Sequence, residues 1–414
     1  MGKIYHLNLL KRISFFAAIT ILTSVVSFLL LPILTKYLSP EDYGVLSIFN
    51  ALIRFIVTFL SLGSINILMV SLIDKKKSFF NLQLRSFFQI SITNAILISA
   101  GIFIYIVLIG SFFGLPNWLA LLSPFIAFGI TSFEAISGIT VFKKQQKEYS
   151  ILVLSKFFLE IFISLFLIVG IGLNWIGRVS GLIISLIIVL FLMYRYLKKE
   201  KHLDFTLSKE VTKDLIKLGT PLILMNVSIT VMNLSDRFFI EKMVGLSDTG
   251  IYNVGAVIGS IELIIANAVI AVFRPIIYTC LKEKTTDKKI QLYNLLILAG
   301  TLIGIYLFND LLFFLFVNEK FYSAKEYVFP IALGFLFWGI SNYYLSYLIF
   351  YKKNTINAFI SIFGMVLNLI LNYILISKFS TIGASYATAI TYFLMAIIIY
   401  IVSLKLIDYD KKDI

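Results

Sequence analysis

Ionisable side chains inside long apolar stretches are the residues of this sequence best suited to bind a charged ligand. Arg54 stands in such a stretch, and its planar guanidinium can bind a phosphate through two parallel hydrogen bonds. A salt bridge or hydrogen bond to a neighbouring helix is the alternative. Lys156 and Glu160 are four residues apart, on one helix face, and can form an ion pair. Alternatively, Lys156 binds a second phosphate and Glu160 is a switch released when a ligand or an ion arrives.

Acidic residues in apolar surroundings are the candidates for ion coupling. Glu134 and Glu262 have no basic residue nearby in the sequence, and an acid in such surroundings can hold and carry a proton. The alternative is a neutral carboxyl group hydrogen-bonded between helices. Adjacent residues point in different directions, so we expect Asp236 and Arg237 to cap a helix or to pair with other helices. The ion-coupling candidates are Glu134, Glu160, Glu262 and Asp236.

Residues for covalent or metal chemistry are scarce. Cys280 is the only cysteine, and the two histidines, His6 and His202, are far apart in the sequence. No GxxxxGK[ST] phosphate-binding loop is present. We therefore expect no catalytic residues, no metal and no cofactor, and a protein that is not an enzyme.

The composition places these residues in a membrane. Of 414 residues, 59% are hydrophobic and 14% are charged, and the mean hydropathy is +0.95. A helix that crosses the hydrocarbon core needs about 20 apolar residues. The apolar stretches are continuous rather than alternating, which excludes a membrane β-barrel and predicts an all-α polytopic fold. Twelve stretches qualify: 14–35, 44–70, 86–110, 120–142, 150–173, 176–197, 218–240, 250–274, 291–316, 327–350, 355–377 and 383–405.

The distribution of basic residues predicts the orientation. With both termini in the cytoplasm, the cytoplasmic segments hold 27 of the 36 Lys and Arg residues, and the external loops hold five. Positive charge is retained on the cytoplasmic side, so this topology is favoured. It also accounts for the net charge of +14 without a nucleic-acid partner. We expect a multi-pass protein of a bacterial cytoplasmic membrane.

The sequence also indicates an internal duplication. A hydrophilic segment, 201–217, separates a predicted N-terminal bundle, 1–200, from a C-terminal bundle, 218–414. Short motifs after the first and seventh stretches, Leu38–Gly44 and Leu246–Tyr252, resemble each other at an offset of 206 to 209 residues. Two other pairs of motifs repeat at the same offset. Six stretches in each half predict a pseudo-two-fold axis along the membrane normal, with a binding cavity near the midplane.

Three longer motifs resemble the polysaccharide transporter family, which includes O-antigen and teichuronic-acid flippases. They are Pro32–Gly44, Gly219–Phe239 with Gly250–Tyr252, and Asn368–Asn372 with Gly383–Ala384 and Ala387–Thr388. The resemblance implies the V-shaped fold of the multidrug/oligosaccharidyl-lipid/polysaccharide exporter superfamily, with two six-helix bundles. It also implies a substrate of undecaprenyl-pyrophosphate-linked oligosaccharide. A pyrophosphate and sugars need a polar, cationic cavity to cross the bilayer.

The resemblance extends to individual arginines by helix only. Related lipid II flippases carry cavity arginines on helices 1, 2 and 8, and Arg12, Arg54 and Arg274 occupy similar places here. The expected pyrophosphate contacts are therefore Arg54, Lys156, Arg12 and Arg274. For Arg12 and Arg274, at predicted cytoplasmic helix ends, anchoring of the topology is the alternative.

Three functions follow as hypotheses. The first is a flippase that moves the lipid-linked oligosaccharide outward by alternating access, coupled to H⁺ or Na⁺, in contact with the bilayer and with polysaccharide polymerase or assembly proteins. The second is a multidrug or small-solute exporter of the same fold. The third is a membrane glycosyltransferase or polymerase, for which the predicted external loops are too short to build a site.

Overall fold

The computed structural model describes residues 28–74, 77–202 and 208–412, together with residues 15, 19, 22 and 23. Within these residues the chain forms fourteen α-helices, α2 to α15, and no strand. The contacts divide the chain into two units, Met1–Val227 and Ser228–Ile414, and the boundary lies inside α9. The all-α prediction is confirmed. The predicted domain limits and the cytoplasmic location of the termini stay predictions.

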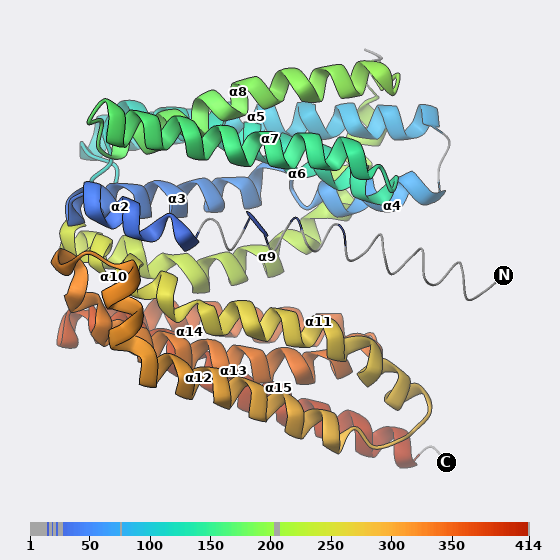
Figure 1. Cartoon of the computed structure of the whole chain (residues 1–414). Coiled ribbons are helices and arrows are strands. Elements are labelled where there is room, and N and C mark those ends of the chain that lie inside the picture. Colours follow the sequence, from blue (N-terminus) through green and yellow to red (C-terminus); the bar gives the residue numbers. More distant parts are fainter. Residues whose placement is uncertain are drawn as a thin grey trace. The chain divides into compact units, whose positions relative to one another are not determined.

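The first unit holds seven helices and the first part of α9 (Figure 1). In chain order they are α2 (Leu31–Tyr37), α3 (Pro40–Leu60), α4 (Ser64–Asp74), α5 (Lys77–Ile109), α6 (Asn117–Phe142), α7 (Gln146–Leu165), the π-helical turn η1 (Phe166–Gly170), α8 (Trp175–Lys199) and α9 (Lys209–Met243). The second unit continues with α10 (Leu246–Gly259), α11 (Ile261–Lys282), α12 (Lys288–Phe316), the 3₁₀ turn η2 (Glu319–Ala324), α13 (Lys325–Phe350), α14 (Asn354–Phe379) and α15 (Ile382–Lys412).

Eleven spans in the described part of the chain are long and apolar enough to cross a membrane. They coincide with the second to twelfth predicted spans, which are thereby confirmed. Most of the first predicted span, 14–35, lies outside the described residues. Many outward side chains are large and apolar, for example Leu108 and Phe314, which are 76% and 75% exposed. Such faces are stable only against lipid, so the chain is a multi-pass membrane protein.

Two spans that the sequence predicts as continuous are each built from two helices. The second span is α3 followed by α4, with left-handed backbone at Leu62 (φ 45°) and Gly63 (φ 72°) between them. Asn94 of α5 donates hydrogen bonds to the carbonyl oxygens of Phe59 and Leu60 at this break, at 3.3 and 3.2 Å, and Phe59 O also accepts from Leu62 N. The eighth span is α10 followed by α11, and the break lies at Ser260.

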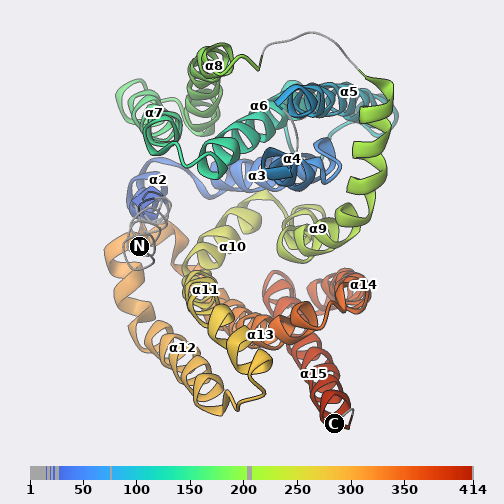
Figure 2. The ribbon, with the colours of Figure 1, turned by 90° about the vertical axis from the view of Figure 1, so that its right-hand side faces the viewer.

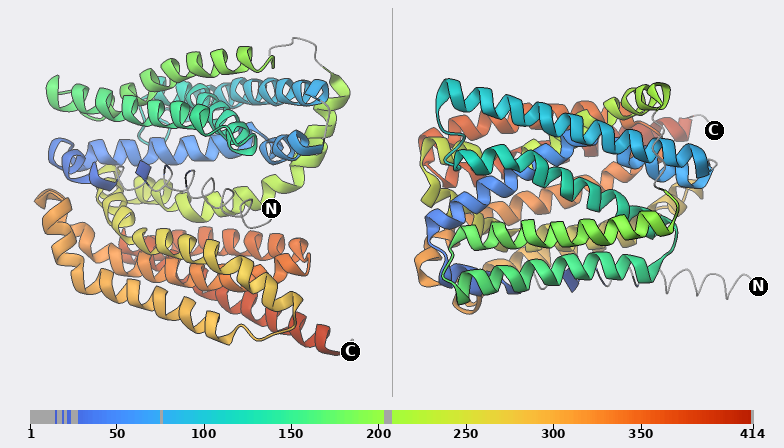
Figure 3. Two further views of the ribbon diagram at one scale, coloured as in Figure 1. Left: turned by 45° about the vertical axis from the view of Figure 1, so that its right-hand side comes forward. Right: turned by 90° about the horizontal axis from the view of Figure 1, so that it is seen from above.

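Small residues let the helices approach closely, as in other membrane bundles. Helices α7 and α8 lie side by side in the first unit (Figure 2), and Gly181 of α8 faces Ser164 of α7. A Cβ atom on Gly181 would lie 2.1 Å from Ser164 Oγ and 2.8 Å from Ser164 N. The second unit is built around α13, which contacts α15, α11, α12 and α10; α13 and α15 lie side by side in Figure 3.

Gly181→Ala should separate α7 from α8, because the added methyl group meets backbone atoms that cannot rotate away. Overpacking of this kind costs about 1–3 kcal/mol. We expect a lower Tm for the purified protein in detergent. Gly300→Ala on α12 is the matched control, since nothing lies within 4 Å of its added Cβ. Equal Tm values for the two variants would contradict the described α7–α8 contact.

Candidate functional site

Arg54 and Glu134 form an ion pair between α3 and α6. Arg54 Nη1 lies 3.1 Å from Glu134 Oε1, and the two side chains are 63% and 38% exposed. The prediction that Glu134 is a lone acid is therefore wrong: α6 packs beside α3 and brings its carboxylate to the guanidinium. An exposed charge within a span is expensive in hydrocarbon, so we do not expect this face to lie against lipid.

A second charged cluster joins α7 and α8. Glu160 Oε2 accepts a hydrogen bond from Lys156 Nζ at 2.9 Å, and Glu160 Oε1 lies 2.8 Å from Arg178 Nη2. Arg178 Nη1 also donates to Ser164 Oγ at 3.1 Å. The predicted Lys156–Glu160 pair is therefore present. Two cations therefore share one carboxylate, which leaves a formal charge of +1. We call Lys156, Glu160 and Arg178 the cationic triad.

Arg178 was not predicted as a ligand candidate, although the sequence holds a signal for it. Helices α7 and α8 form an antiparallel hairpin with a short connection after η1. In such a hairpin, residues before and after the turn face each other, and Arg178 lies only a few residues beyond it. Counting outward from the turn places Arg178 level with Leu167, since Gly177 faces Ile168 and Gly181 faces Ser164. The long arginine side chain then reaches Ser164 and Glu160 on α7.

Asp236 and Arg237 form the centre of a buried network in the second unit. Arg237 Nη1 lies 2.7 Å from Asp236 Oδ1, and Tyr252 of α10 donates to Asp236 Oδ2 at 2.6 Å. The prediction that the adjacent pair diverges is wrong in one respect: the long Arg237 side chain folds back along α9, where it also donates to Asn233 O. The predicted pairing of Asp236 with another helix is present, through Tyr252.

The remaining predicted residues are distributed along α11. Glu262 lies in its first turn, completely buried, and neither carboxylate oxygen has a hydrogen-bond partner among the described residues. Arg274 lies about three turns further on, and its Nε donates to Ser346 Oγ of α13 at 3.3 Å. Arg12 lies outside the described residues. No structural contact tests its predicted role.

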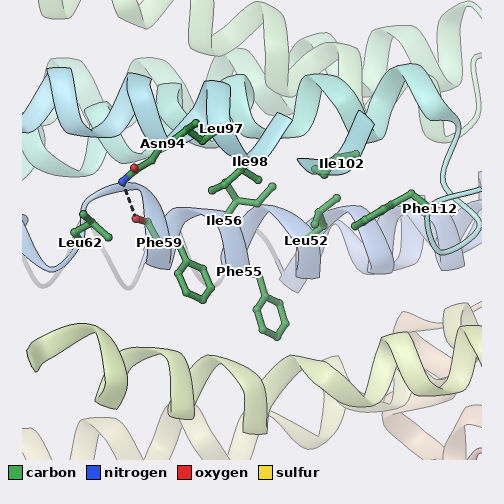
Figure 4. Close-up of a pocket in the computed structure, with 10 residues that line it drawn as sticks. All are labelled: Leu52, Phe55, Ile56, Phe59, Leu62, Asn94, Leu97, Ile98, Ile102 and Phe112. Carbon is green, nitrogen blue, oxygen red and sulfur yellow. Dashed lines mark hydrogen bonds between the residues drawn. The ribbon is translucent and has the colours of Figure 1, made fainter. Parts of the chain in front are cut away.

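An apolar pocket of about 410 Å³ lies between α3 and α5 (Figure 4). In Figure 4, Ile56 of α3 points toward Ile98 of α5. The one polar residue that lines this pocket is Asn94, and it donates hydrogen bonds to the carbonyl oxygens of Phe59 and Leu60. The pocket has no charged lining residue and fits hydrocarbon rather than a phosphate. It is lined by Leu52, Phe55, Ile56, Phe59, Leu62, Asn94, Leu97, Ile98, Ile102 and Phe112.

A polar cluster at the ends of the spans ties three segments of the first unit together. Lys143 Nζ lies 2.7 Å from Glu200 Oε2 and 2.9 Å from His202 Nε2. His202 Nδ1 lies 2.5 Å from Asn81 Oδ1, at the start of α5. This arrangement fits a neutral imidazole that donates to Asn81 and accepts from the Lys143 ammonium group. The cluster was not predicted, because its members are up to 121 residues apart in the sequence.

Glu200 gives this cluster a pH dependence. Burial raises the pKa of Glu200, but the hydrogen bond and positive charge of Lys143 outweigh it, so the pKa is lowered from its ordinary value of 4.5. A lowered pKa means that the ion pair stabilises the folded state above the unfolded pKa. This stabilisation is lost as the pH falls from about 4.5 through the folded pKa.

Glu200→Gln should therefore lower the Tm at pH 7. The free energy of unfolding should fall by about 1 kcal/mol, the contribution of a partly exposed ion pair. The difference from wild type should shrink as the pH falls below 4.5, because wild-type Glu200 then becomes neutral as well. Thermal unfolding of the detergent-solubilised protein between pH 3.5 and 7.5 measures both effects. Glu283→Gln, at the exposed end of α11, is the control. A difference independent of pH would contradict the ion-pair explanation.

Comparisons with known proteins identify the fold and the family. The inward-facing conformation of a multidrug resistance MATE family transporter of the MOP superfamily has a similar structure (TM-score 0.75, 15% identity), with 93% of this chain and 94% of that chain covered. The lipid II flippase MurJ in an inward closed conformation is also similar (TM-score 0.73, 14% identity, 94% and 87% covered). A mutant of the Vibrio cholerae MATE transporter VcmN follows (TM-score 0.59, 13% identity, 94% and 98% covered).

These likenesses show the fold, which is that of MOP-superfamily proteins, as predicted. A search of curated protein sequences found no match. The model of one family, described as polysaccharide biosynthesis protein, matches residues 9–281, about two thirds of the chain. The chain belongs to the polysaccharide biosynthesis protein family.

Proposed function

We propose that this protein is a flippase that moves an undecaprenyl-pyrophosphate-linked oligosaccharide from the cytoplasmic to the outer leaflet of a bacterial inner membrane. The observation that carries the proposal is the exposed Arg54 guanidinium, held inside a span by a single contact with Glu134. In a family of polysaccharide biosynthesis proteins, a cation at this depth has an obvious ligand in the pyrophosphate of a lipid carrier.

The geometry of the Arg54–Glu134 pair supports a binding role. Only one guanidinium nitrogen contacts the carboxylate, and both side chains remain substantially exposed. A buried ion pair needs good geometry and additional hydrogen bonds to offset its desolvation, and the Arg54–Glu134 pair is neither buried nor supported in this way. A pyrophosphate could form parallel hydrogen bonds with the guanidinium and so displace Glu134. Glu134 would then hold Arg54 only while no ligand is bound.

The cationic triad is the second feature that favours an anionic ligand. It places a formal charge of +1 in a span, and Lys156 also lies 5.5 Å from the ring of Phe133. A net positive charge of this kind attracts phosphates and repels the cationic compounds that many drug exporters carry. It therefore favours a lipid pyrophosphate over a cationic drug as the substrate. The apolar pocket beside α3 offers a surface for hydrocarbon in the same unit.

In this mechanism, transport proceeds by alternating access, in which Arg54 is open to one side of the membrane at a time. The pyrophosphate enters on the cytoplasmic side and binds Arg54, while the polyprenyl chain stays in lipid. A conformational change then exposes the headgroup to the outside, coupled to the movement of H⁺ or Na⁺ in the opposite direction. Arg274 and Arg12 are further proposed contacts of the pyrophosphate on the cytoplasmic side.

Arg54→Ala should reduce flipping by at least tenfold, because a charge-assisted hydrogen bond of about 1.5–3 kcal/mol is lost. Arg54→Lys should restore only part of the activity, since an ammonium group cannot bind a phosphate bidentately. The measurement is the rate at which proteoliposomes move a fluorescent undecaprenyl-pyrophosphate-linked trisaccharide between leaflets. Lys378→Ala at the exposed end of α14 removes the same charge elsewhere. Wild-type activity in Arg54→Ala would exclude the proposed role.

Glu134→Gln should strengthen binding of the pyrophosphate, because it removes the internal competitor for Arg54. An exposed ion pair contributes about 0.2–1 kcal/mol, so the Kd for undecaprenyl pyrophosphate should fall by up to about fivefold. Binding to the purified protein in detergent micelles gives the Kd. Combining Glu134→Gln with Arg54→Ala should abolish the gain. An unchanged or weaker affinity in the single variant would show that Glu134 does not compete with the ligand.

A further inference from the structure

Glu262 differs from every other acidic residue located deep in a described span. Glu134 is paired with Arg54, Glu160 with Lys156 and Arg178, and Asp236 with Arg237. Glu262 alone among these four has a completely buried side chain with no hydrogen bond to either oxygen, within the described residues. The first three carboxylates are neutralised by a cation, and Glu262 is not.

Among the described helices that contact α11, no charged side chain lies at the level of Glu262. One turn before it, Gly259 packs against Ile331 of α13, and one turn after it, Ala266 packs against Gly339. Glu262 therefore lies between these two close contacts of α11 with α13, and is enclosed there. The nearest helices, α10, α12 and α13, carry no Asp, Glu, Lys or Arg at 249–259, 290–309 or 328–350, and α11 carries none at 263–273. Tyrosines are the only titratable groups there: Tyr252, Tyr293, Tyr306, Tyr343, Tyr344 and Tyr347.

Electrostatics decides the protonation state of such a group. An unpaired carboxylate at this depth would cost several kcal/mol or more, whereas the neutral acid avoids most of that cost. In the conformation described here, Glu262 is therefore a neutral carboxylic acid. It can lose its proton only if the surrounding helices move and admit water or a cation.

A Gly–Ser pair, Gly259 and Ser260, lies just before Glu262, and such pairs are places where helices bend. The eighth span passes from α10 to α11 at Ser260, two residues before Glu262. Helical hydrogen bonds from Ser260 N to Ala256 O and from Ile264 N to Ser260 O continue across this point. A hinge at this point changes the direction of α11 and with it the burial of the first-turn side chains. Protonation and the angle between α10 and α11 are then linked, since the neutral acid stabilises the buried conformation.

We propose that Glu262 is the proton-carrying group of the transport cycle, so that the coupled ion is H⁺. The inference rests on the proposed flippase function. In one conformation the carboxylate takes up a proton from water on the acidic side of the membrane. After the hinge at Ser260 closes over the neutral acid and reopens toward the other side, the O–H bond breaks and the proton passes to water there. One proton moves inward for each substrate that moves outward.

Chemical labelling tests the protonation state without transport. Dicyclohexylcarbodiimide is apolar and adds to protonated carboxyl groups, which it converts to stable N-acylureas. Wild-type protein in membranes at pH 7 should carry the adduct on the peptide that contains Glu262, and not on those that contain Glu134 or Glu160. Mass spectrometry locates it, and Glu262→Gln is the control. An unmodified Glu262 under conditions that label other carboxyl groups would overturn the proposal.

Flipping of the fluorescent trisaccharide lipid in proteoliposomes tests coupling. A gradient of one pH unit can bias a one-proton exchange by up to about tenfold. Wild type should show this acceleration, and Glu262→Gln, which keeps the volume of the neutral acid, should flip at a rate independent of the gradient. Equal gradient responses would overturn the role of Glu262. If wild type does not flip the lipid even without a gradient, the proposed function itself fails, and the labelling result still decides the state of Glu262.

Discussion

The free-energy cost of placing charge in hydrocarbon is the constraint that organises this molecule. Every acidic side chain deep in a described span is either neutralised by a cation or, in the case of Glu262, buried without one. The pairs differ in a way that matters for function. Asp236 and Arg237 are enclosed in a network of hydrogen bonds, while Arg54 and Glu134 share a single exposed contact. The first pair joins α9 to α10, and the second is the pair from which we propose that a ligand displaces Glu134.

The same constraint explains why so much of the fold could be predicted. Lipid requires long apolar helices, so eleven predicted spans were confirmed from apolar length alone. The helix breaks at Leu62–Gly63 and Ser260 were not predicted, because both segments are apolar on either side of the break. Contacts between helices accompany both breaks: Asn94 of α5 donates to carbonyl oxygens at the first, and the glycines of α10 allow close packing on α13 beside the second.

The charged residues of the site could be predicted from the sequence, but the partners with which they pair could not. A lone Arg, Lys or Glu in an apolar stretch is visible in the sequence, and Arg54, Lys156, Glu160 and Glu262 were found this way. Their pairings depend on which helices are neighbours. Glu134 lies 80 residues from its partner Arg54 in the sequence, so the prediction that Glu134 has no partner was wrong. Arg178 completes the cationic triad but was not predicted. The Glu262 carboxyl is isolated in the sequence and, within the described residues, in the structure as well.

The central claim is that this chain carries a pyrophosphate-linked oligosaccharide across the membrane. The most direct measurement is the leaflet distribution of that lipid in cells from which the gene has been deleted, with spheroplasts probed by a membrane-impermeant lectin or glycosidase. We predict that a complete lipid-linked oligosaccharide accumulates in the cytoplasmic leaflet and is inaccessible from outside until the gene is restored. No accumulation, or a lipid fully accessible from outside, would contradict it.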